Sequence, residues 1–303
     1  MRLADYIGAR RAQIDEALTR FLPSPPVFPR VLYDAMRYSL DAGGKRLRPI
    51  LTLAAAEAVA RPSSTAARAI ELALPAACAV ELIHTYSLIH DDLPAMDDDS
   101  LRRGRSTNHV VYGEGMAILA GDGLLTEAFA LLSVEPRDPD LASRKIRAIQ
   151  AIASAAGASG MVGGQAIDLL AVGLPALDEH SLQDMHARKT GALIRAAAVA
   201  GAIMGGGCND AIAAVDEYGR HLGLAFQIVD DILDVEGDAK ALGKTAGKDA
   251  RAGKPTYPST YGLDESRRLA AARHDDAMAA LRSAGLGESP LAEIADWVIK
   301  RTN

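Results

Sequence analysis

Two clusters of carboxylates, far apart in the chain, constrain the fold more than any other feature of the sequence. The first lies in residues 88–99, LIHDDLPAMDDD, and the second in residues 230–234, DDILD; each follows an apolar run of helical period. Like charges crowded at the end of a buried helix repel one another. A hard cation such as Mg²⁺ relieves that repulsion, because it prefers carboxylate and phosphate oxygens. The two clusters therefore predict one metal site that is assembled from two helices.

The second cluster places its outer carboxylates on one helix face. Asp230 and Asp234 are four residues apart, and Gln227 lies three residues before Asp230. Positions three and four apart share a face of an α-helix, so these side chains point the same way. Asp231 lies between them, and we expect this carboxylate to belong to the same site.

The first cluster is less regular, because Asp91 and Asp97 are six residues apart. In an unbroken helix these side chains would point roughly 240° apart. Pro94 disrupts the helix between them, which lets the chain turn Asp97 back toward Asp91. His84 lies two turns before Asp91 and nearly in line with it. Asp92 directly follows Asp91 and completes the expected set of carboxylates.

Basic residues in several parts of the chain match the needs of two diphosphate groups. Taken singly, each basic group is typical of a solvated surface, just as each acidic cluster alone is typical of a helix end. Taken together, they fit one diphosphate held through Mg²⁺ and another held directly by Arg and Lys. These residues are Lys45, Arg46, Arg48, Arg102, Arg103, Lys189, Lys244 and Lys254. His90 has no evident role in this scheme.

The composition favours an all-α fold. Hydrophobic residues make up 49% of the chain and aromatic residues only 4%, which suits close packing of Ala-rich and Leu-rich helices. Period-2 alternation is absent, so no sheet is expected. We expect a single domain over residues 1–303 with about ten helices in one bundle. The expected helices cover residues 2–20, 27–40, 45–60, 65–91, 115–133, 141–170, 178–204 and 209–235, and a last one begins at 290.

Charge and hydropathy also indicate the partners. The net charge of −6 gives no reason to expect nucleic acid, and the local basic groups indicate small anionic substrates. The first residues, MRLAD, lack the apolar segment of a signal peptide. Apolar runs such as 192–207 are interrupted by charge and too short to span a bilayer. We therefore expect a cytoplasmic protein without a transmembrane segment.

A series of motifs, taken in order, resembles those of the trans-isoprenyl diphosphate synthase family, with the bacterial farnesyl diphosphate synthases as the nearest subgroup. The motifs are GGKRLRP (43–49), HTYSLIHDDLPAMDDD (84–99), LRRG (101–104), GGQAID (163–168), KTG (189–191), FQIVDDILD (226–234) and KPTYP (254–258). The resemblance covers nearly the whole chain. It implies the isoprenoid synthase fold, an all-α bundle around a central cavity.

The resemblance implies a role for each matching residue, with three Mg²⁺ ions in the site and Mn²⁺ as a possible substitute. Asp91 and Asp97 would bind two of the ions and Asp230 the third, with Asp234 acting through water. Asp92 and Asp231 would orient the others or act as secondary ligands. The allylic diphosphate would be held by Arg102, Lys189, Lys244 and Lys254. The diphosphate of isopentenyl diphosphate would be held by Gly44, Lys45, Arg48, His84 and Arg103. Thr190 and Gln227 would face the developing allylic cation.

The implied reaction condenses isopentenyl diphosphate with dimethylallyl and geranyl diphosphate to give (2E,6E)-farnesyl diphosphate. Tyr86 and Ser87 lie five and four residues before Asp91, where related synthases form the floor of the pocket for the growing tail. A bulky Tyr86 with a small Ser87, together with the inserted Pro94-Ala95, resembles synthases that stop at C15. Tyr86 as an ordinary core residue is the alternative.

Other functions remain open at this point. Geranylgeranyl or geranyl diphosphate synthases share the chemistry and differ in product length. A terpene cyclase shares the fold, but residues 230–234 and 43–49 argue against it. A regulatory subunit of a hetero-oligomeric synthase would be expected to lose acidic motifs, and both are intact here. The resemblance also implies a homodimer.

Overall fold

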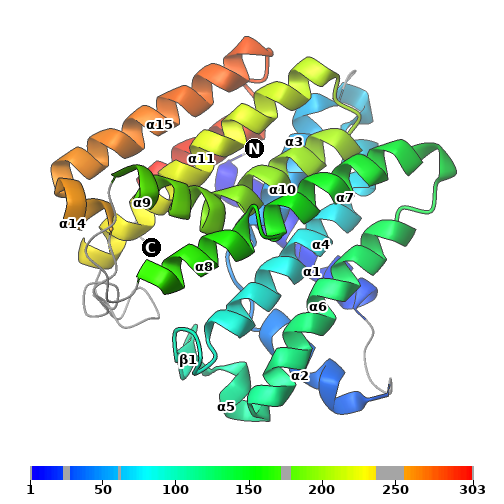
Figure 1. Cartoon of the computed structure of the whole chain (residues 1–303). Coiled ribbons are helices and arrows are strands. Elements are labelled where there is room, and N and C mark those ends of the chain that lie inside the picture. The colour runs from blue at the N-terminus through cyan, green and yellow to red at the C-terminus, as the bar shows by residue number, and fades with distance from the viewer. Residues whose placement is uncertain (1, 23–27, 61–62, 172–178, 237–255, 302–303) are drawn as a thin grey trace.

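Helix α10 (Ala192–Met204) lies in the middle of the bundle and packs against α3 (Leu47–Val59), α4 (Ala66–Asp91), α7 (Ala142–Ala156) and α11 (Asn209–Glu236) in the computed structural model (Figure 1). The structure describes residues 2–22, 28–60, 63–171, 179–236 and 256–301. Every residue from Ala196 to Met204 is buried, and most are alanine or glycine. Side chains this small let four neighbouring helices approach α10 closely, which explains its central place.

The other elements surround this centre. They are α1 (Leu3–Phe21), α2 (Arg30–Leu40), η1 (Ser63–Thr65), β1 (Leu101–Arg102), β2 (Arg105–Ser106), α5 (Asn108–Tyr112), α6 (Glu114–Val134), η2 (Pro139–Leu141), α8 (Met161–Ala171), α9 (Glu179–His186), η3 (Ala187–Gly191), α14 (Tyr257–Tyr261), α15 (Leu263–Ser283) and α16 (Pro290–Lys300). Twelve of the described α-helices have at least eight residues. The all-α fold class is thus confirmed.

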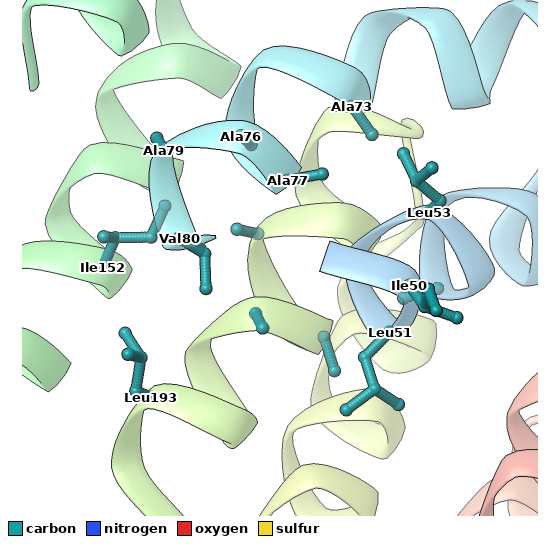
Figure 2. Packing of buried hydrophobic residues seen from close by; sticks show 14 of the residues in the cluster. Ile50, Leu51, Leu53, Ala73, Ala76, Ala77, Ala79, Val80, Ile152 and Leu193 are labelled. Atoms are coloured by element: carbon teal, nitrogen blue, oxygen red, sulfur yellow. The ribbon is translucent and has the colours of Figure 1, made fainter. Parts of the chain in front are cut away.

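Aliphatic side chains fill the space between α3, α4, α7 and α10 (Figure 2). Helix α4 contributes a run of alanines, and larger side chains come from the facing helices. Figure 2 labels Ile50, Leu51, Leu53, Ala73, Ala76, Ala77, Ala79, Val80, Ile152 and Leu193. Burying one Leu or Ile side chain contributes about 1.5–3 kcal/mol. This core fixes the position of α4, and therefore of the carboxylates where α4 ends.

Several elements differ from the expectation, among them the short helices α5 and α14, which were not expected. The helix expected over residues 141–170 is two helices, α7 and α8, with Gly157 and Gly160 in the turn between them. Residues 263–283 form α15, which the sequence did not reveal because its buried face is made mostly of small residues such as Ala270 and Ala277. The strands β1 and β2 form a hairpin in which Arg102 is opposite Arg105. Strands of two residues are too short to show a period-2 pattern.

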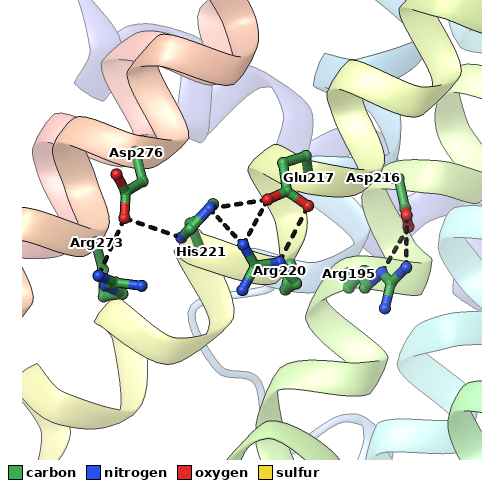
Figure 3. Close-up of polar contacts among 7 residues, drawn as sticks. All are labelled: Arg195, Asp216, Glu217, Arg220, His221, Arg273 and Asp276. Carbon is green, nitrogen blue, oxygen red and sulfur yellow. Dashed lines mark hydrogen bonds and ion pairs between the residues drawn. The ribbon is translucent and has the colours of Figure 1, made fainter.

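Polar contacts supplement the thin apolar face of α15. Figure 3 shows His221 of α11 between two carboxylates, Glu217 on its own helix and Asp276 on α15. The nearest N–O distances are 3.1 Å to Glu217 and 3.4 Å to Asp276. Next to them, Arg195 of α10 donates to Asp216 of α11 at 2.6 Å. These contacts join α10, α11 and α15.

Two described helices, α4 and α6, are long and apolar enough to cross a membrane by length and composition alone. The expectation that apolar runs are too short to span a bilayer is therefore wrong for these two helices, although the run at 192–207 is not one of them. In α4, 78% of the apolar window is buried inside the fold, as in a core helix. In α6 the buried share is 33%, so much of its apolar surface faces outward. The apolar surface of α4 is thus accounted for by the bundle, and that of α6 is not.

Candidate active site

The first acidic cluster turns back on the helix that carries it. Helix α4 ends at Asp91, and the backbone N–H of Asp97 donates to the carbonyl of Asp91 at 2.9 Å. The N–H of Asp99 likewise donates to the carbonyl of Asp92 at 3.1 Å. Pro94 lies inside this loop, as expected from its effect on a helix. The turn that the spacing required is therefore present, and it brings Asp97 beside Asp91.

Asp91 is held in an environment that disfavours its charge. Burial raises the pKa of this carboxyl to about 6. Lys189 opposes that shift, while the neighbouring Asp97 adds to it. A cation nearby would favour the charged form of Asp91. The electrostatics of the first cluster thus fit a bound cation.

Asp92 forms an ion pair with Arg102 of the same chain. Both of its carboxylate oxygens accept from Nε of Arg102 at 2.8 Å, and a terminal nitrogen of Arg102 donates to Oδ1 at 2.5 Å. Asp92 is 3% exposed. Such a buried, bidentate pair fixes the Arg102 guanidinium beside the metal-ligand candidates. Asp92 is therefore placed to orient Arg102, and both of its carboxylate oxygens are already hydrogen-bonded.

The second cluster divides its carboxylates between two environments. Asp231 is buried; its Oδ1 accepts from Nε2 of Gln227 at 2.8 Å, and its Oδ2 accepts from the backbone N–H of Tyr257 at 2.9 Å. Asp230 and Asp234 are only partly buried. Asp231 therefore ties α11 to α14, while Asp230 and Asp234 stay partly exposed to solvent.

Arg301, which the sequence reasoning missed, lies on the second cluster. Its terminal nitrogen is 2.7 Å from Oδ1 of Asp230 and donates to the carbonyl of Phe226 at 2.8 Å. Its guanidinium carbon is 3.8 Å from the centre of the Phe226 ring. An arginine near the end of a helix is common in any sequence. The sequence holds one indirect signal: the carboxylates at residues 230–234 require cationic partners, but nothing in the pattern identifies Arg301 as one of them.

Most of the residues expected to bind the second diphosphate meet at the N-terminal end of α3. A terminal nitrogen of Arg48 donates to Nε2 of His84 at 3.3 Å. Burial, assisted by Arg48 and then Arg103, holds the pKa of His84 well below its usual range. An added Cβ at Gly44 would lie 2.7 Å from the guanidinium of Arg103, so that guanidinium lies directly on the Gly44 backbone. Gly44, Arg48, His84 and Arg103 are therefore one cluster, whereas the resemblance implied that Lys45 would belong to it as well.

The side chains of Lys45 and Arg46 contact residues outside this cluster. Nζ of Lys45 is 6.0 Å from the centre of the Trp297 ring, and burial and then Arg301 lower its pKa. Arg46 points inward and is 5% exposed. It donates to Oε1 of Glu81 at 2.7 Å. Arg46 is thus a structural residue in the middle of a basic motif, and Lys45 faces the second acidic cluster.

Three non-glycine residues in the described ranges have left-handed backbone conformations, and all three border these charged clusters. Arg46 has φ near +51°, Asp98 near +51° and Arg103 near +54°. The backbone therefore turns sharply at the polar rim of the site.

Lys189 and Thr190 lie on η3, a single π-helical turn between α9 and α10. Such a turn inserts a residue into the helical ladder and reorients its side chains. Nζ of Lys189 donates to Oδ2 of Asp168 on α8 at 2.5 Å. An added Cβ at Gly164 of α8 would lie 2.2 Å from the backbone nitrogen of Lys189. The GGQAID motif thus supplies both a close backbone contact and a buried partner for Lys189.

A cavity of about 380 Å³ lies between α4, α8 and η3. Asp91 and Lys189 line it, and so do Tyr86 and Ser87 from earlier in α4. Its remaining walls are Arg48, His84, Leu88, His90, Met96, Met161, Val162, Gln165, Ala166, Leu169 and Thr190. Charged groups and apolar side chains thus share one space, as needed for a substrate with an anionic head and a hydrocarbon tail.

The donor set suits Mg²⁺ bound together with a diphosphate. Within the part of the chain that the structure describes, no three His, Cys, Asp or Glu side chains converge into a ready metal cage. Mg²⁺ usually takes one or two protein carboxylates and completes its shell with water and substrate phosphates. The partly buried carboxylates of the two clusters, flanked by Lys and Arg, fit that mode. Lys244 and Lys254 lie outside the described residues.

Comparisons with known proteins indicate the same family as the sequence motifs. The polyprenyl synthetase family model matches residues 29–283. The chain is 48% identical over 301 residues to geranylgeranyl pyrophosphate synthase 11 of Arabidopsis thaliana, covering 98% of this chain and 82% of that protein. It is 42% identical over 301 residues to the farnesyl diphosphate synthase of Geobacillus stearothermophilus, covering 99% and 98%. A solved FPP/GFPP synthase from Zymomonas mobilis aligns with a TM-score of 0.83 at 38% identity, over 98% of both chains.

Proposed function

The chain belongs to the polyprenyl synthetase family of short-chain prenyltransferases, and from that premise we propose that it is a farnesyl diphosphate synthase. It would condense isopentenyl diphosphate first with dimethylallyl diphosphate and then with geranyl diphosphate. The intact acidic motifs support a catalytic chain rather than a regulatory subunit.

The position of Tyr86 supports C15 as the product length. Tyr86 lines the cavity on the same helix as Asp91, five residues earlier. Five residues of α-helix span about 7.5 Å along the axis. Tyr86 is 7% exposed, so its ring is held by packing and presents a bulky wall. A tail growing from the carboxylate end along α4 would meet this ring.

The residues around the allylic diphosphate would assist its departure. Mg²⁺, with Mn²⁺ as a substitute and three ions in the complete site, would neutralise the leaving diphosphate. Arg102, fixed by Asp92, and Lys189, fixed by Asp168, would hold the same anion from the protein side. Both cations are held in place before the reaction, so little reorganisation is needed when the C–O bond breaks.

Two neutral groups would face the allylic cation. Gln227 donates its amide N–H to Asp231, which leaves its carbonyl oxygen as the end that can stabilise positive charge. Thr190 lines the cavity beside Lys189, and its hydroxyl oxygen is a second such acceptor. The apolar walls would exclude water, which would otherwise quench the cation.

The Gly44, Arg48, His84 and Arg103 cluster would hold isopentenyl diphosphate. His84 is neutral, because its pKa is lowered, and its Nε2 accepts from Arg48. His84 therefore orients the Arg48 guanidinium without adding a charge to the cluster. The released diphosphate would take the proton, so no separate protein base is required.

A longer product is the second candidate. The 48% identical Arabidopsis relative carries the name of a geranylgeranyl synthase, and Ser87 on the cavity wall is small. A tail that passes Tyr86 on the Ser87 side would reach C20.

We propose a homodimer with α6 at its interface. Ile118 and Leu119 of α6 are 44% and 53% exposed, and Val110 and Val111 of the adjacent α5 are 52% and 47% exposed. The inner face of α6 packs on α4 and α2, so α6 is part of the bundle rather than a separate membrane span. A second copy, as the family resemblance implies, would cover this apolar face.

Light scattering should give a dimer mass for the wild type and for Leu119→Met. Leu119→Glu should give a monomer, and a dimer in that variant would place the interface elsewhere.

The decisive assay is product length. The protein is incubated with isopentenyl diphosphate and C5, C10 or C15 allylic primers in Mg²⁺, and the products are resolved by chain length. We expect C15 from the C5 and C10 primers and little extension of the C15 primer.

Tyr86→Ala should give C20 or longer products, and Ser87→Phe should stop elongation at C10. Accumulation of C20 by the wild type would favour the second candidate, and no turnover with any primer would refute the synthase.

A further inference from the structure

His90 contacts Tyr86 on one side and helix α6 on the other. Tyr86 and His90 are one turn apart on α4, and both line the cavity. Their rings meet edge to face, with centroids 5.6 Å apart and an interplanar angle of 81°. Residues four apart on a helix share a face, so the His90 ring limits the space into which the Tyr86 ring can turn.

Helix α6 holds the His90 ring by one hydrogen bond and one close backbone approach. Nε2 of His90 donates to the carbonyl of Ile118 at 3.0 Å. An added Cβ at Gly121, one turn later in α6, would lie 2.2 Å from Nε2 and 2.5 Å from Cδ2 of His90. The imidazole therefore occupies the space that any side chain at Gly121 would fill. The carboxylate of Asp122 lies 3.9 Å from the same nitrogen.

From this geometry we infer that His90 and Gly121 are specificity-determining positions for product length, acting through Tyr86. The Gly121 gap sets how far the His90 ring sits from the cavity, and the His90 ring sets the position of Tyr86. His90 is a positioning residue in this arrangement, since Tyr86 and not His90 forms the floor. The inference rests on the proposed prenyl synthase function and on the floor assigned to Tyr86.

The two positions have opposite expected effects. His90→Ala removes the ring and lets Tyr86 turn into the vacated space, which deepens the cavity. Gly121→Ala pushes the His90 ring away from α6 and toward Tyr86, which makes the cavity shallower. A change of one methyl-sized group in an apolar pocket typically alters discrimination by about tenfold. We therefore expect the C20 to C15 ratio to rise about tenfold in His90→Ala and the C15 to C10 ratio to fall about tenfold in Gly121→Ala.

The experiment measures the product distribution of each variant at matched turnover, with the unfolding midpoint as a second readout. Gly115→Ala is the matched control, because an added Cβ on that α6 glycine meets nothing within 4 Å. His90→Gln keeps an N–H donor at similar reach and should stay near the wild-type distribution. In the Tyr86→Ala background, His90→Ala should add no further change in length.

Stability provides a separate test of the contact. Gly121→Ala should lower the unfolding midpoint, and His90→Ala in the same chain should restore it, because the clash partner is the imidazole. A well-folded His90→Ala protein with an unchanged product ratio would overturn the inference. Additive length changes from His90→Ala and Tyr86→Ala would also overturn it. If Tyr86→Ala alone does not change the product length, Tyr86 does not form the floor of the cavity. That result can be told apart from the two outcomes above, because it does not involve His90.

Discussion

Asp91 has charged neighbours of both signs. Burial and Asp97 disfavour its charged form, whereas Lys189 favours it. Asp230 is in a comparable position, with Arg301 as its cationic neighbour. A divalent cation with a diphosphate would satisfy both carboxylates at once.

Replacing either carboxylate by alanine should therefore abolish most turnover without unfolding the protein. For Asp91→Ala and Asp230→Ala we expect kcat to fall by about 10²–10³-fold, as when one preorganised electrostatic group is removed. Asp275→Ala, on an 82% exposed carboxylate of α15, is the matched control. Steady-state kinetics and circular dichroism are the measurements. Near-normal kcat in either variant would exclude a metal site shared by the two clusters.

Gly44 allows a comparison between neighbouring glycines. Gly43 and Gly44 have φ near +76° and +140°, so alanine strains the backbone at both. The new Cβ would reach the Arg103 guanidinium at 2.7 Å from Gly44, but its nearest neighbour from Gly43 is Arg11 at 3.7 Å. Gly44→Ala should raise KM for isopentenyl diphosphate about tenfold, as for the loss of one hydrogen bond to a charged group. Equal effects at both glycines would show that backbone strain alone is responsible.

Individual residues show where sequence reasoning ends. The resemblance grouped Gly44, Arg48, His84 and Arg103, which the structure brings together, but it also included Lys45, which lies beside Trp297 instead. The GGKRLRP motif gave no sign that Arg46 points into the core toward Glu81, since side-chain direction depends on the left-handed backbone at Arg46. Contacts between residues far apart in the chain could not be predicted from the sequence either. The Asp168 contact of Lys189 joins elements that no local pattern relates.

At the scale of elements, Arg46 joins three helices. Its guanidinium bonds Asp15 of α1 at 2.9 Å, the Leu40 carbonyl at the end of α2 at 2.8 Å, and Glu81 of α4 at 2.7 Å. The pair with Glu81 is almost fully buried, with 4% and 3% of the two side chains exposed. The position of the basic motif relative to α4 depends on this residue.

Arg46→Ala should therefore destabilise the fold strongly. Removing one partner of a buried pair leaves Glu81 without its counter-charge, which typically costs about 3–5 kcal/mol. Arg68→Ala is the control, since its pair with Glu71 is more than half exposed and should contribute about 0–1 kcal/mol. Urea unfolding of the two variants gives the free energies. Equal losses would contradict a structural role for Arg46.

The elements that were predicted correctly have wide apolar stripes. Helices α4, α10 and α11 follow continuous helical period, so their existence was evident from sequence. Helix α15 was missed because its inward residues, such as Ser266 and Ala277, are small. The break between α7 and α8 was missed because only glycine and serine mark it in residues 157–160, without a proline. The η3 turn was not foreseen, since a π-turn depends on packing against α8 rather than on local propensity.

For the whole molecule, acidity should weaken the fold partly through His186. This side chain is 7% exposed, and burial lowers its pKa to about 4, with Asp168 opposing the shift and Lys189 adding to it. In the unfolded chain its pKa is near 6.5. Between these values the unfolded state binds a proton that the folded state does not. The free energy of unfolding should therefore fall as the pH drops from about 6.5 to about 4.

His186→Gln should remove this part of the acid sensitivity. The expected difference is about 2 kcal/mol less loss of stability between pH 7.5 and pH 5 than in the wild type. Urea unfolding at the two pH values measures it, with His274→Gln as a control on a more exposed histidine. An unchanged pH dependence in His186→Gln would show that His186 is not protonated on unfolding in this range.

The left-handed residues at the polar rim have a consequence for protein engineering. An L-residue in this conformation costs about 1–2 kcal/mol relative to a relaxed backbone, a cost that glycine does not carry. In the described ranges, Arg46, Asp98 and Arg103 all border the charged clusters. Asp98→Gly would relieve this cost, whereas Arg103→Gly would relieve it and remove a guanidinium from the basic cluster. Selection for thermostability alone would erode this rim first, so activity should be screened together with stability from the first round.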